Sequence, residues 1–309
     1  MNVLVTGGAG YIGTALVDEL AQNPEINQII IYDNLTRENR NLFINTNPHL
    51  NGKVKLIQAD ILDTRRIRKA LKDVQVVYHL AAKVMAPFSN VDAHFFEQIN
   101  HWGTAELAYA LEEAPSIIKV IFVSSTAVYG ASKELVQENA PPNPITFYAS
   151  SKQRAEQHML RIASKIPTTI VRCGNVYGFN TSMRFDTVIN KFMFDAHFNN
   201  KISIHGNGKQ TRSFVHIDRV SNLLANIYNT KEASGIYHLT DKNLQIIDLV
   251  DALKEIYPEM EFTFINQHIT MEDLKVDAST NLAQFYTIEQ KTLIEELNAF
   301  KGKLGFVPN

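Results

Sequence analysis

The stretch Val3-Leu4-Val5-Thr6-Gly7-Gly8-Ala9-Gly10-Tyr11-Ile12-Gly13 decides the predicted fold. It consists of a short apolar strand, a glycine turn and the start of a helix whose apolar residues recur at three- and four-residue steps. Gly7 lets the chain leave the strand tightly, Gly10 lets a diphosphate approach backbone N–H groups, and Gly13 lets the helix lie close to the sheet. The helix N-terminus adds unpaired donors and partial positive charge. A glycine pattern alone is a weak signal, so its surroundings have to support it.

A second apolar run supplies that support. Residues 29–32 end at Asp33, twenty residues after Gly13. Dinucleotide-binding folds place there a carboxylate that accepts hydrogen bonds from the adenosine ribose. An acid at this point repels a 2′-phosphate, so NAD is favoured over NADP, although the nearby Arg37 softens that preference. We therefore predict an NAD site.

Strands and helices alternate up to about residue 170. The predicted strands cover residues 54–57, 74–80, 117–123 and 168–171, and the predicted helices cover residues 92–113 and 155–166. This alternation predicts an α/β fold, a Rossmann-type doubly wound parallel sheet. Ligands of such sheets bind beyond the C-terminal ends of the strands, where Asp33, Asp60, Ala81 and Ser125 fall.

The alternation weakens beyond residue 175. Helices are expected over 185–198, 220–228, 248–257 and 287–300, and extended segments over 202–204 and 214–217. We expect an NAD-binding domain over residues 1–174 and a smaller, mixed α/β substrate lobe over residues 175–309. Segments at about 210–240 are expected to return to the first domain.

Composition restricts the partners. The 309-residue chain is 45% hydrophobic and 20% charged, with a formal net charge of −2, which gives no reason to expect nucleic acid. The single cysteine, Cys173, excludes an internal disulfide and suits a reducing compartment. No apolar run approaches the roughly 20 residues that span a bilayer, and the first strand begins at the second or third residue. We expect a cytoplasmic protein without a membrane partner.

Two Tyr/Lys pairs have the four-residue spacing that puts both side chains on one helix face: Tyr129 with Lys133, and Tyr148 with Lys152. A lysine ammonium favours phenolate over phenol and so turns a group of pKa about 10 into a usable base. Tyr129 lies where a strand ends, and prolines after Lys133 interrupt any helix, so packing at a turn is its expected role. Tyr148 opens a good helical run, which favours Tyr148 and Lys152 as the catalytic pair.

Ser125 ends the strand that precedes this helix, 23 residues before Tyr148. Its hydroxyl can reach the same substrate oxygen as Tyr148. No His/Asp set accompanies it, so a nucleophilic serine is not expected. The histidines are scattered without metal-ligand spacing, and no metal site is predicted; they include His79, His101, His158, His205 and His216.

Together these residues resemble the extended short-chain dehydrogenase/reductase family, specifically its nucleotide-sugar epimerases and dehydratases such as UDP-glucose 4-epimerase. The match covers most of residues 1–220. Its blocks are residues 6–13, 33–35, 60–61, 79–82, 100–104, 124–130, 148–152, 172–178 and 212–218. So many blocks in the same order are specific for the fold and the cofactor.

The resemblance implies roles for individual residues. NAD would be bound by Gly7, Gly10, Tyr11, Ile12, Gly13, Asp33, Asn34, Asp60, Ile61, Leu80, Ala81, Ala82, Lys83, Asn100, Tyr148 and Lys152. Asp60 and Ile61 would flank the adenine, and Asn100 would support the loop of Ala81 to Lys83 at the nicotinamide half. The substrate would meet Ser125, Thr126, Tyr148, Asn175 and Arg212. Asn175 could instead be a turn residue, and Arg212 a surface cation.

The resemblance also bears on the reaction. Family members that eliminate water place an acid, often an Asp-Glu pair, just after the Ser/Thr, where this chain has Thr126 and Ala127. That favours a 4-epimerase. Tyr148 would take the proton from the sugar 4-hydroxyl while the C4 hydride passes to NAD⁺, and the 4-keto sugar would turn over and receive the hydride on its other face.

The chain departs from the family pattern at several positions. Ser213 replaces the usual aspartate, Phe147 a proline and Ala149 a glycine. No arginine follows Arg219, whereas family members commonly clamp the diphosphate with a second, C-terminal arginine. Lysines such as Lys275 are the available substitutes, and a lysine is a point charge rather than a bidentate fork.

Two other functions stay open. One is an NAD(P)-dependent 4-keto-sugar reductase or dehydratase on the same scaffold, and the reductase, a one-way oxidoreductase, would consume NAD(P)H during turnover. A non-catalytic dinucleotide-binding protein is the other alternative, although such family members often lose the Tyr/Lys pair. A homodimer is also expected, because the helix carrying Phe95, Phe96, Ile99 and Trp102 has more apolar surface than one core stripe requires.

Overall fold

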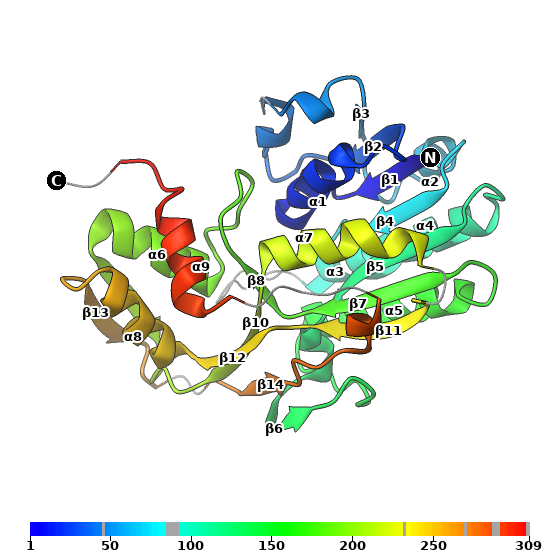
Figure 1. Cartoon of the computed structure of the whole chain (residues 1–309). Coiled ribbons are helices and arrows are strands. Elements are labelled where there is room, and N and C mark those ends of the chain that lie inside the picture. Colours follow the sequence, from blue (N-terminus) through cyan, green and yellow to red (C-terminus); the bar gives the residue numbers. More distant parts are fainter. Residues whose placement is uncertain (45–46, 85–92, 231–232, 269–270, 286–290, 307–309) are drawn as a thin grey trace.

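The computed structural model describes residues 1–44, 47–84, 93–230, 233–268, 271–285 and 291–306. Its core is a seven-stranded parallel sheet in the order β3-β2-β1-β4-β5-β7-β11 (Figure 1). The strands are β1 (Asn2–Thr6), β2 (Gln28–Asp33), β3 (Val54–Gln58), β4 (Val76–His79), β5 (Lys119–Ser125), β7 (Thr168–Cys173) and β11 (Gly235–Leu239). The predicted Rossmann-type doubly wound sheet is confirmed.

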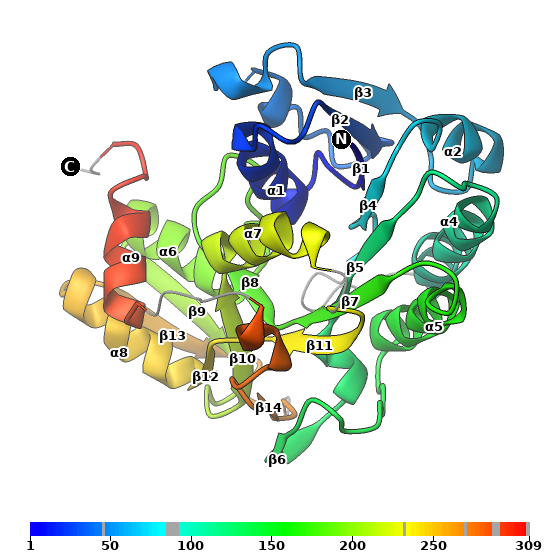
Figure 2. The same cartoon turned by 45° about the vertical axis from the view of Figure 1, so that its right-hand side comes forward.

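Helices cover both faces of this sheet (Figure 2). On one face lie α1 (Tyr11–Gln22) and α7 (Ile217–Asn226), and on the other lie α2 (Thr64–Ala70), α4 (Gly103–Glu112) and α5 (Phe147–Ile162). The central strand β1 shows why both layers form. Val3 and Val5 join the core under α1 and α7, and Leu4 joins the core on the opposite side. Side chains alternate along a strand, so an uninterrupted apolar run needs cover on both faces.

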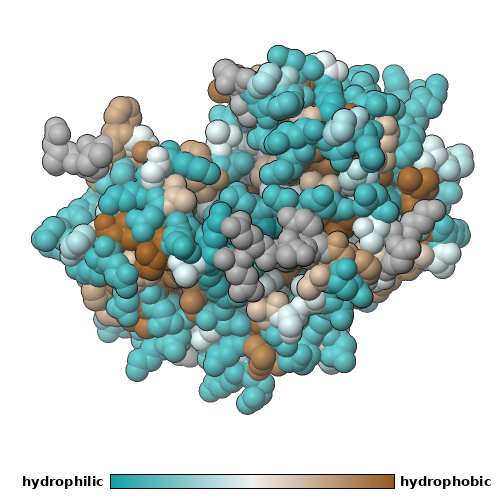
Figure 3. Space-filling model, viewed as in Figure 1, coloured by the Kyte–Doolittle hydropathy of each residue, from teal (hydrophilic) through white to brown (hydrophobic). Residues whose placement is uncertain are grey.

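The second lobe has its own core. Its helices are α6 (Val188–Asn199), α8 (Ile246–Ile256) and α9 (Leu293–Lys301). Three small sheets lie outside the central sheet: β8 (Asn175–Tyr177), β10 (Thr211–His216) and β12 (Lys242–Gln245); β9 (Lys201–His205) with β13 (Glu261–Ile265); and β6 (Ser132–Val136), which precedes residue 175, with β14 (Leu274–Val276). The face in Figure 3 is mainly hydrophilic, with hydrophobic side chains in small separate groups. Although α7 and β11 come from beyond residue 174, the division into two domains stays a prediction.

Some element boundaries differ from the sequence-based prediction. The helix expected over 92–113 is described from Ala93 and is interrupted: α3 (Ala93–Phe96) passes through a π-helical segment (Glu97–Trp102) into α4. The helix expected over 155–166 already begins at Phe147, because the Thr146 side chain accepts a hydrogen bond from the Ala149 N–H and caps it. The last helix begins at Leu293 after a Thr292 capping box, while residues 287–290 lie outside the described residues.

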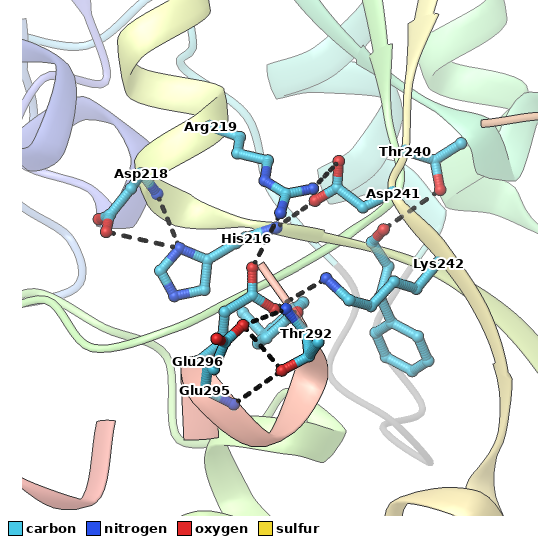
Figure 4. A network of polar contacts seen from close by, with 11 residues as sticks. His216, Asp218, Arg219, Thr240, Asp241, Lys242, Thr292, Glu295 and Glu296 are labelled. Atoms are coloured by element: carbon cyan, nitrogen blue, oxygen red, sulfur yellow. Dashed lines mark hydrogen bonds and ion pairs between the residues drawn. The ribbon is translucent and has the colours of Figure 1, made fainter. Parts of the chain in front are cut away.

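A buried network of charges fastens α9 to the rest of the molecule (Figure 4). Glu296, which is 4% exposed, lies 3.2 Å from Arg219 of α7 and 2.8 Å from Lys242 of β12, and it also accepts a hydrogen bond from Tyr177 of β8. Arg219 makes a second ion pair, at 2.8 Å, with Asp241. Three separate parts of the chain thus meet at one carboxylate.

Candidate active site

A cleft of about 770 Å³ opens at the C-terminal ends of the central strands. Its lining includes nearly every residue that the sequence predicted for the cofactor or the substrate: Gly7, Gly10, Tyr11, Ile12, Gly13, Asp33, Asn34, Asp60, Ile61, Leu80, Ala81, Ala82, Lys83, Ser125, Thr126, Tyr148, Lys152, Asn175 and Arg212. Asn100 is the exception. Residues from the whole length of the chain therefore converge where a doubly wound sheet binds ligands.

The glycine turn fits a dinucleotide diphosphate. Gly7 has φ of +72°, and a Cβ there would lie 2.6 Å from the Ala81 nitrogen. A Cβ at Gly13 would lie 2.3 Å from the Gly7 carbonyl oxygen. Larger side chains at Gly7 or Gly13 would fill the hollow of this turn, called the glycine cradle below, or push α1 away from the sheet. The first residues of α1 line the cleft, so the backbone donors at the helix N-terminus are available to an anion there. The cradle thus has the shape and polarity that NAD requires.

Asp33 occupies the other end of the cofactor cleft. Its carboxylate accepts hydrogen bonds from the backbone N–H groups of Ala9, at 3.0 Å, and Leu35, at 2.8 Å. These bonds fix the carboxylate at the end of β2. Arg37 lines the same wall, and burial together with the charge of Arg184 lowers the pKa of its guanidinium.

Asn100 acts from behind the cleft wall. It is 1% exposed and lies in the π-helical segment. Its side chain accepts from the Lys83 N–H at 2.7 Å, donates to the Lys83 carbonyl at 2.9 Å and donates to the Ser151 hydroxyl at 2.9 Å. Asn100 therefore ties the loop at Lys83 to α5, the helix of Tyr148.

Tyr148, Ser125 and Lys152 meet at the end of β5. Burial raises the pKa of Tyr148, and a hydrogen bond with the Ser125 side chain acts in the opposite direction. The Lys152 ammonium donates to the Val123 carbonyl at 2.7 Å and lies 4.2 Å from the centre of the Phe122 ring. Burial lowers the pKa of Lys152 to about 8. The arrangement joins a phenol, a hydroxyl and a buried cation on one wall.

The alternative pair, Tyr129 and Lys133, does not line this cleft. Tyr129 is buried, and its hydroxyl donates to the Glu138 carbonyl at 3.2 Å. Lys133 lies on β6 and is exposed. This geometry favours Tyr148 over Tyr129 as the reactive tyrosine.

Asn175 and Arg212, which the sequence predicted for the substrate, both line the cleft. The Asn175 amide donates to the Ser213 carbonyl at 2.9 Å, so its side chain is held against β10. Arg212 donates to the carbonyls of Thr211 and Glu272. Lys275, the candidate replacement for the absent C-terminal arginine, does not line the cleft.

The prediction missed several lining residues. Arg184 lies between β8 and α6, and its guanidinium forms a fork on Asp186, at 2.9 and 2.6 Å. Its position after a strand end was the available signal. Glu272, Asp273 and Leu274 lie more than 50 residues beyond the last block of the resemblance, and no local pattern marks them.

The segment that carries Arg184 is fastened to the cofactor helix α1. The Tyr11 hydroxyl donates to the Gly178 carbonyl at 2.5 Å, and Thr14 donates to the Ser182 hydroxyl at 2.8 Å. The Asn190 side chain accepts from the Gly178 N–H at 3.0 Å and so adds α6 to the same junction. The two lobes are therefore hydrogen-bonded to each other next to the glycine turn.

In the described part of the chain, no three His, Cys, Asp or Glu side chains gather into a group that could hold a metal ion. Its helices are all too short or too polar to cross a membrane.

Comparison with known proteins agrees with this geometry. The sequence profile of the NAD dependent epimerase/dehydratase family matches residues 3–239. This chain belongs to that family. A Methanocaldococcus jannaschii protein provisionally named UDP-glucose 4-epimerase is 34% identical over 260 residues, which are 82% of this chain and 81% of that protein. Human dTDP-D-glucose 4,6-dehydratase is 33% identical over 267 residues, 84% of this chain and 74% of that protein.

A solved structure gives the same result. UDP-glucuronic acid 4-epimerase from Bacillus cereus, in complex with UDP-glucuronic acid and NAD, has a TM-score of 0.84 to this chain, with 25% identity and 98% of both chains covered. The chain is thus an NAD-dependent enzyme of the sugar-nucleotide epimerase/dehydratase type, and its cofactor is NAD.

Proposed function

We propose that this enzyme is a nucleotide-sugar 4-epimerase. The observation that carries the proposal is the composition of the β5 end: Ser125 and Tyr148 both line the cleft there, while the residues that follow Ser125, Thr126 and Ala127, offer no carboxylic acid. Thr126 is 2% exposed, and its hydroxyl lies 3.5 Å from that of Ser213. Dehydratases of this family carry the acid that removes water just after the Ser/Thr. This chain has no acid at that position.

The proposed mechanism uses three side chains. Tyr148 accepts the proton of the sugar 4-hydroxyl at its phenolic oxygen and later returns it. Ser125 donates a hydrogen bond to the same sugar oxygen, and the Lys152 ammonium stabilises the phenolate electrostatically. The chemistry that bound NAD supplies is acceptance of a hydride from sugar C4 and its return. Arg212 and Asn175 hold the nucleotide part of the substrate.

The test is a turnover experiment with purified protein and a panel of UDP- and dTDP-sugars. We expect interconversion of C4 epimers with no net change in NADH absorbance, because every hydride is returned. In a parallel assay supplied with NADH and a 4-keto nucleotide sugar, net NADH consumption would instead identify a 4-keto-sugar reductase. Loss of water from the sugar would identify a dehydratase, the reaction named for the human relative.

We also infer a homodimer in the cytoplasm. Phe95 and Trp102 are 54% and 56% exposed, and Tyr109 on α4 and Leu160 on α5 are also exposed. Phe96, which the sequence grouped with this surface, is 2% exposed and belongs to the interior. An apolar surface over two neighbouring helices supports association through α4 and α5.

A further inference from the structure

A buried acid lies one helical turn beyond Lys152. Tyr148, Lys152 and Glu156 follow one another at four-residue steps and share one face of α5. Lys152 is 3% exposed and Glu156 is 2% exposed. Lys152 donates to the carbonyl of Val123, and the Ser124 hydroxyl donates to Glu156 at 2.5 Å. Lys152 and Glu156 are therefore hydrogen-bonded to two consecutive residues of β5, Val123 and Ser124.

Arg172 of β7 holds the acid in place. Its Nε and Nη2 atoms donate to the two carboxylate oxygens of Glu156, at 2.9 and 2.7 Å. Arg172 is 3% exposed, and its guanidinium lies 4.8 Å from the centre of the Tyr129 ring. Such a fork fixes the orientation of the carboxylate. A buried ion pair of this kind seldom stabilises a fold more than well-packed apolar residues do. Stability alone therefore does not explain why Glu156 and Arg172 are buried here, and the charge that Glu156 places near Lys152 offers another reason.

Three other titratable groups near Lys152, on β4, β7 and α5, are neutral at pH 7. Burial and the charge of Lys152 lower the pKa of His79 on β4 to about 3. Burial raises the pKa of Cys173 on β7 to about 12 and also raises the pKa of Tyr148. Burial lowers the pKa of Lys152, and Glu156 is the largest influence that opposes it. Among the described residues around Lys152, Glu156 thus supplies the negative charge and Arg172 its counter-charge.

We propose that Glu156 is a positioning residue for Lys152: fixed by Arg172 and Ser124, its carboxylate keeps the Lys152 ammonium charged beside Tyr148. The proposal rests on the roles given above to Tyr148 and Lys152. With those roles, Tyr148 and Lys152 would titrate as a coupled pair. When the pair releases one proton, either the phenolate and ammonium remain, or the phenol and neutral amine remain. A negative charge on the lysine side of the pair favours the phenolate and ammonium.

The experiment is an ultraviolet titration of the whole protein without sugar substrate. Tyrosinate absorbance is followed against pH, and the same protein carrying Tyr148→Phe is subtracted to isolate Tyr148. Glu156→Gln should lower the midpoint of the Tyr148–Lys152 pair by about one pH unit and reduce the amplitude of the Tyr148 phenolate signal. Glu156→Asp keeps the charge and should retain most of that amplitude.

Glu112→Gln is the matched control. Glu112, the last residue of α4, pairs with Arg161 at the C-terminal end of α5 and with Lys165 just beyond it, at 2.7 and 2.9 Å. This change therefore removes ion pairs at the far end of α5 without touching Lys152. It should leave the titration unchanged. If Glu156→Gln does not fold, Glu156→Gln with Arg172→Met removes the whole buried pair and should still reduce the phenolate amplitude.

A purely structural role gives a different result. In that case the Glu156 variants would lower the melting temperature while the midpoint and amplitude for Tyr148 stayed at the parent values, and the proposal would be overturned. Equal loss of amplitude in Glu156→Gln and Glu156→Asp would overturn it as well, because charge would then not be the cause. Because no sugar is present, the titration is independent of whether the reaction is epimerisation.

Discussion

Thr6 and His79 stand opposite each other in the parallel pairing of β1 and β4, with the Thr6 hydroxyl oxygen 2.7 Å from His79 Nδ1. The second ring nitrogen lies 2.8 Å from the Thr104 hydroxyl oxygen. His79 is 0% exposed, so a charged imidazolium would have to form without water. The folded protein consequently resists protonation of this histidine.

This burial predicts a loss of stability in acid. The pKa of His79 is lowered from an ordinary 6.5 to about 3, so between these values the unfolded chain binds a proton that the folded chain does not. The free energy of unfolding should therefore fall as pH decreases, by about 2 kcal/mol between pH 7 and pH 5. Urea unfolding at both values measures it. His79→Gln should lose this part of the pH dependence, and an unchanged slope would contradict the assignment.

Replacing the reactive phenol tests the proposed base. Tyr148→Phe should lower kcat by about 10²- to 10⁴-fold, the usual contribution of a general acid–base group, while NAD stays bound. Tyr129→Phe is the matched control, because it removes one hydroxyl from a buried tyrosine outside the cleft, and its activity should be unchanged. Sugar interconversion at the parental rate in Tyr148→Phe would disprove the catalytic role.

The glycine cradle predicts a sharp steric effect. Alanine is usually favoured over glycine inside a helix, yet the Cβ of Gly13→Ala would lie 2.3 Å from the Gly7 carbonyl oxygen. We expect NAD affinity to fall by more than tenfold, because about 1.4 kcal/mol of lost binding energy already gives that factor. Isothermal titration with NAD measures it. Gly305→Ala, whose added methyl would meet nothing within 4 Å, should bind normally.

The buried junction at α9 predicts a stability effect. Glu296→Ala leaves Lys242 without its carboxylate partner and Arg219 with Asp241 alone. Breaking a buried ion pair from one side costs about 3–5 kcal/mol, to be measured by urea unfolding. Glu255→Ala, an exposed change on α8, should have little effect. Equal stability of the two variants would show that the network contributes nothing.

The proposed dimer has its own test. Trp102→Glu places a charge on the exposed surface of the π-helical segment and should lower the mass from dimer to monomer in light scattering at micromolar concentration. Phe306→Glu alters an equally apolar side chain that is 90% exposed near the other end of the molecule, and it should leave the mass unchanged. A monomeric parent protein would refute the dimer directly.

Local patterns predicted the sheet and much of the cleft because each block carries its own signal. The apolar run at Val3 and the glycine turn after it specify a strand and a helix start within one stretch of chain. Arg184 and Leu274 lacked such a signal. Leu274 reaches the cleft because β14 pairs with β6 from Ser132 to Val136, over a separation of more than 130 residues.

The π-helical segment was missed for a different reason. Its apolar residues continue the helical pattern, so periodicity alone predicts one regular helix. The wider π-helical turn is defined by its backbone hydrogen bonds, and it carries Asn100, whose side chain bonds to Lys83 and Ser151. Contacts between distant segments decide such irregularities, and a single sequence does not display them.

The hydrogen bonds from Tyr11 to Gly178 and from Thr14 to Ser182 have a mechanical consequence. The helix α1 begins at the glycine turn and also holds residues 178–182 through these bonds. Residues 178–182 therefore cannot move away from α1 without breaking bonds next to the glycine turn. Loss of these two bonds should therefore disturb the glycine turn and the segment that carries Arg184 at the same time.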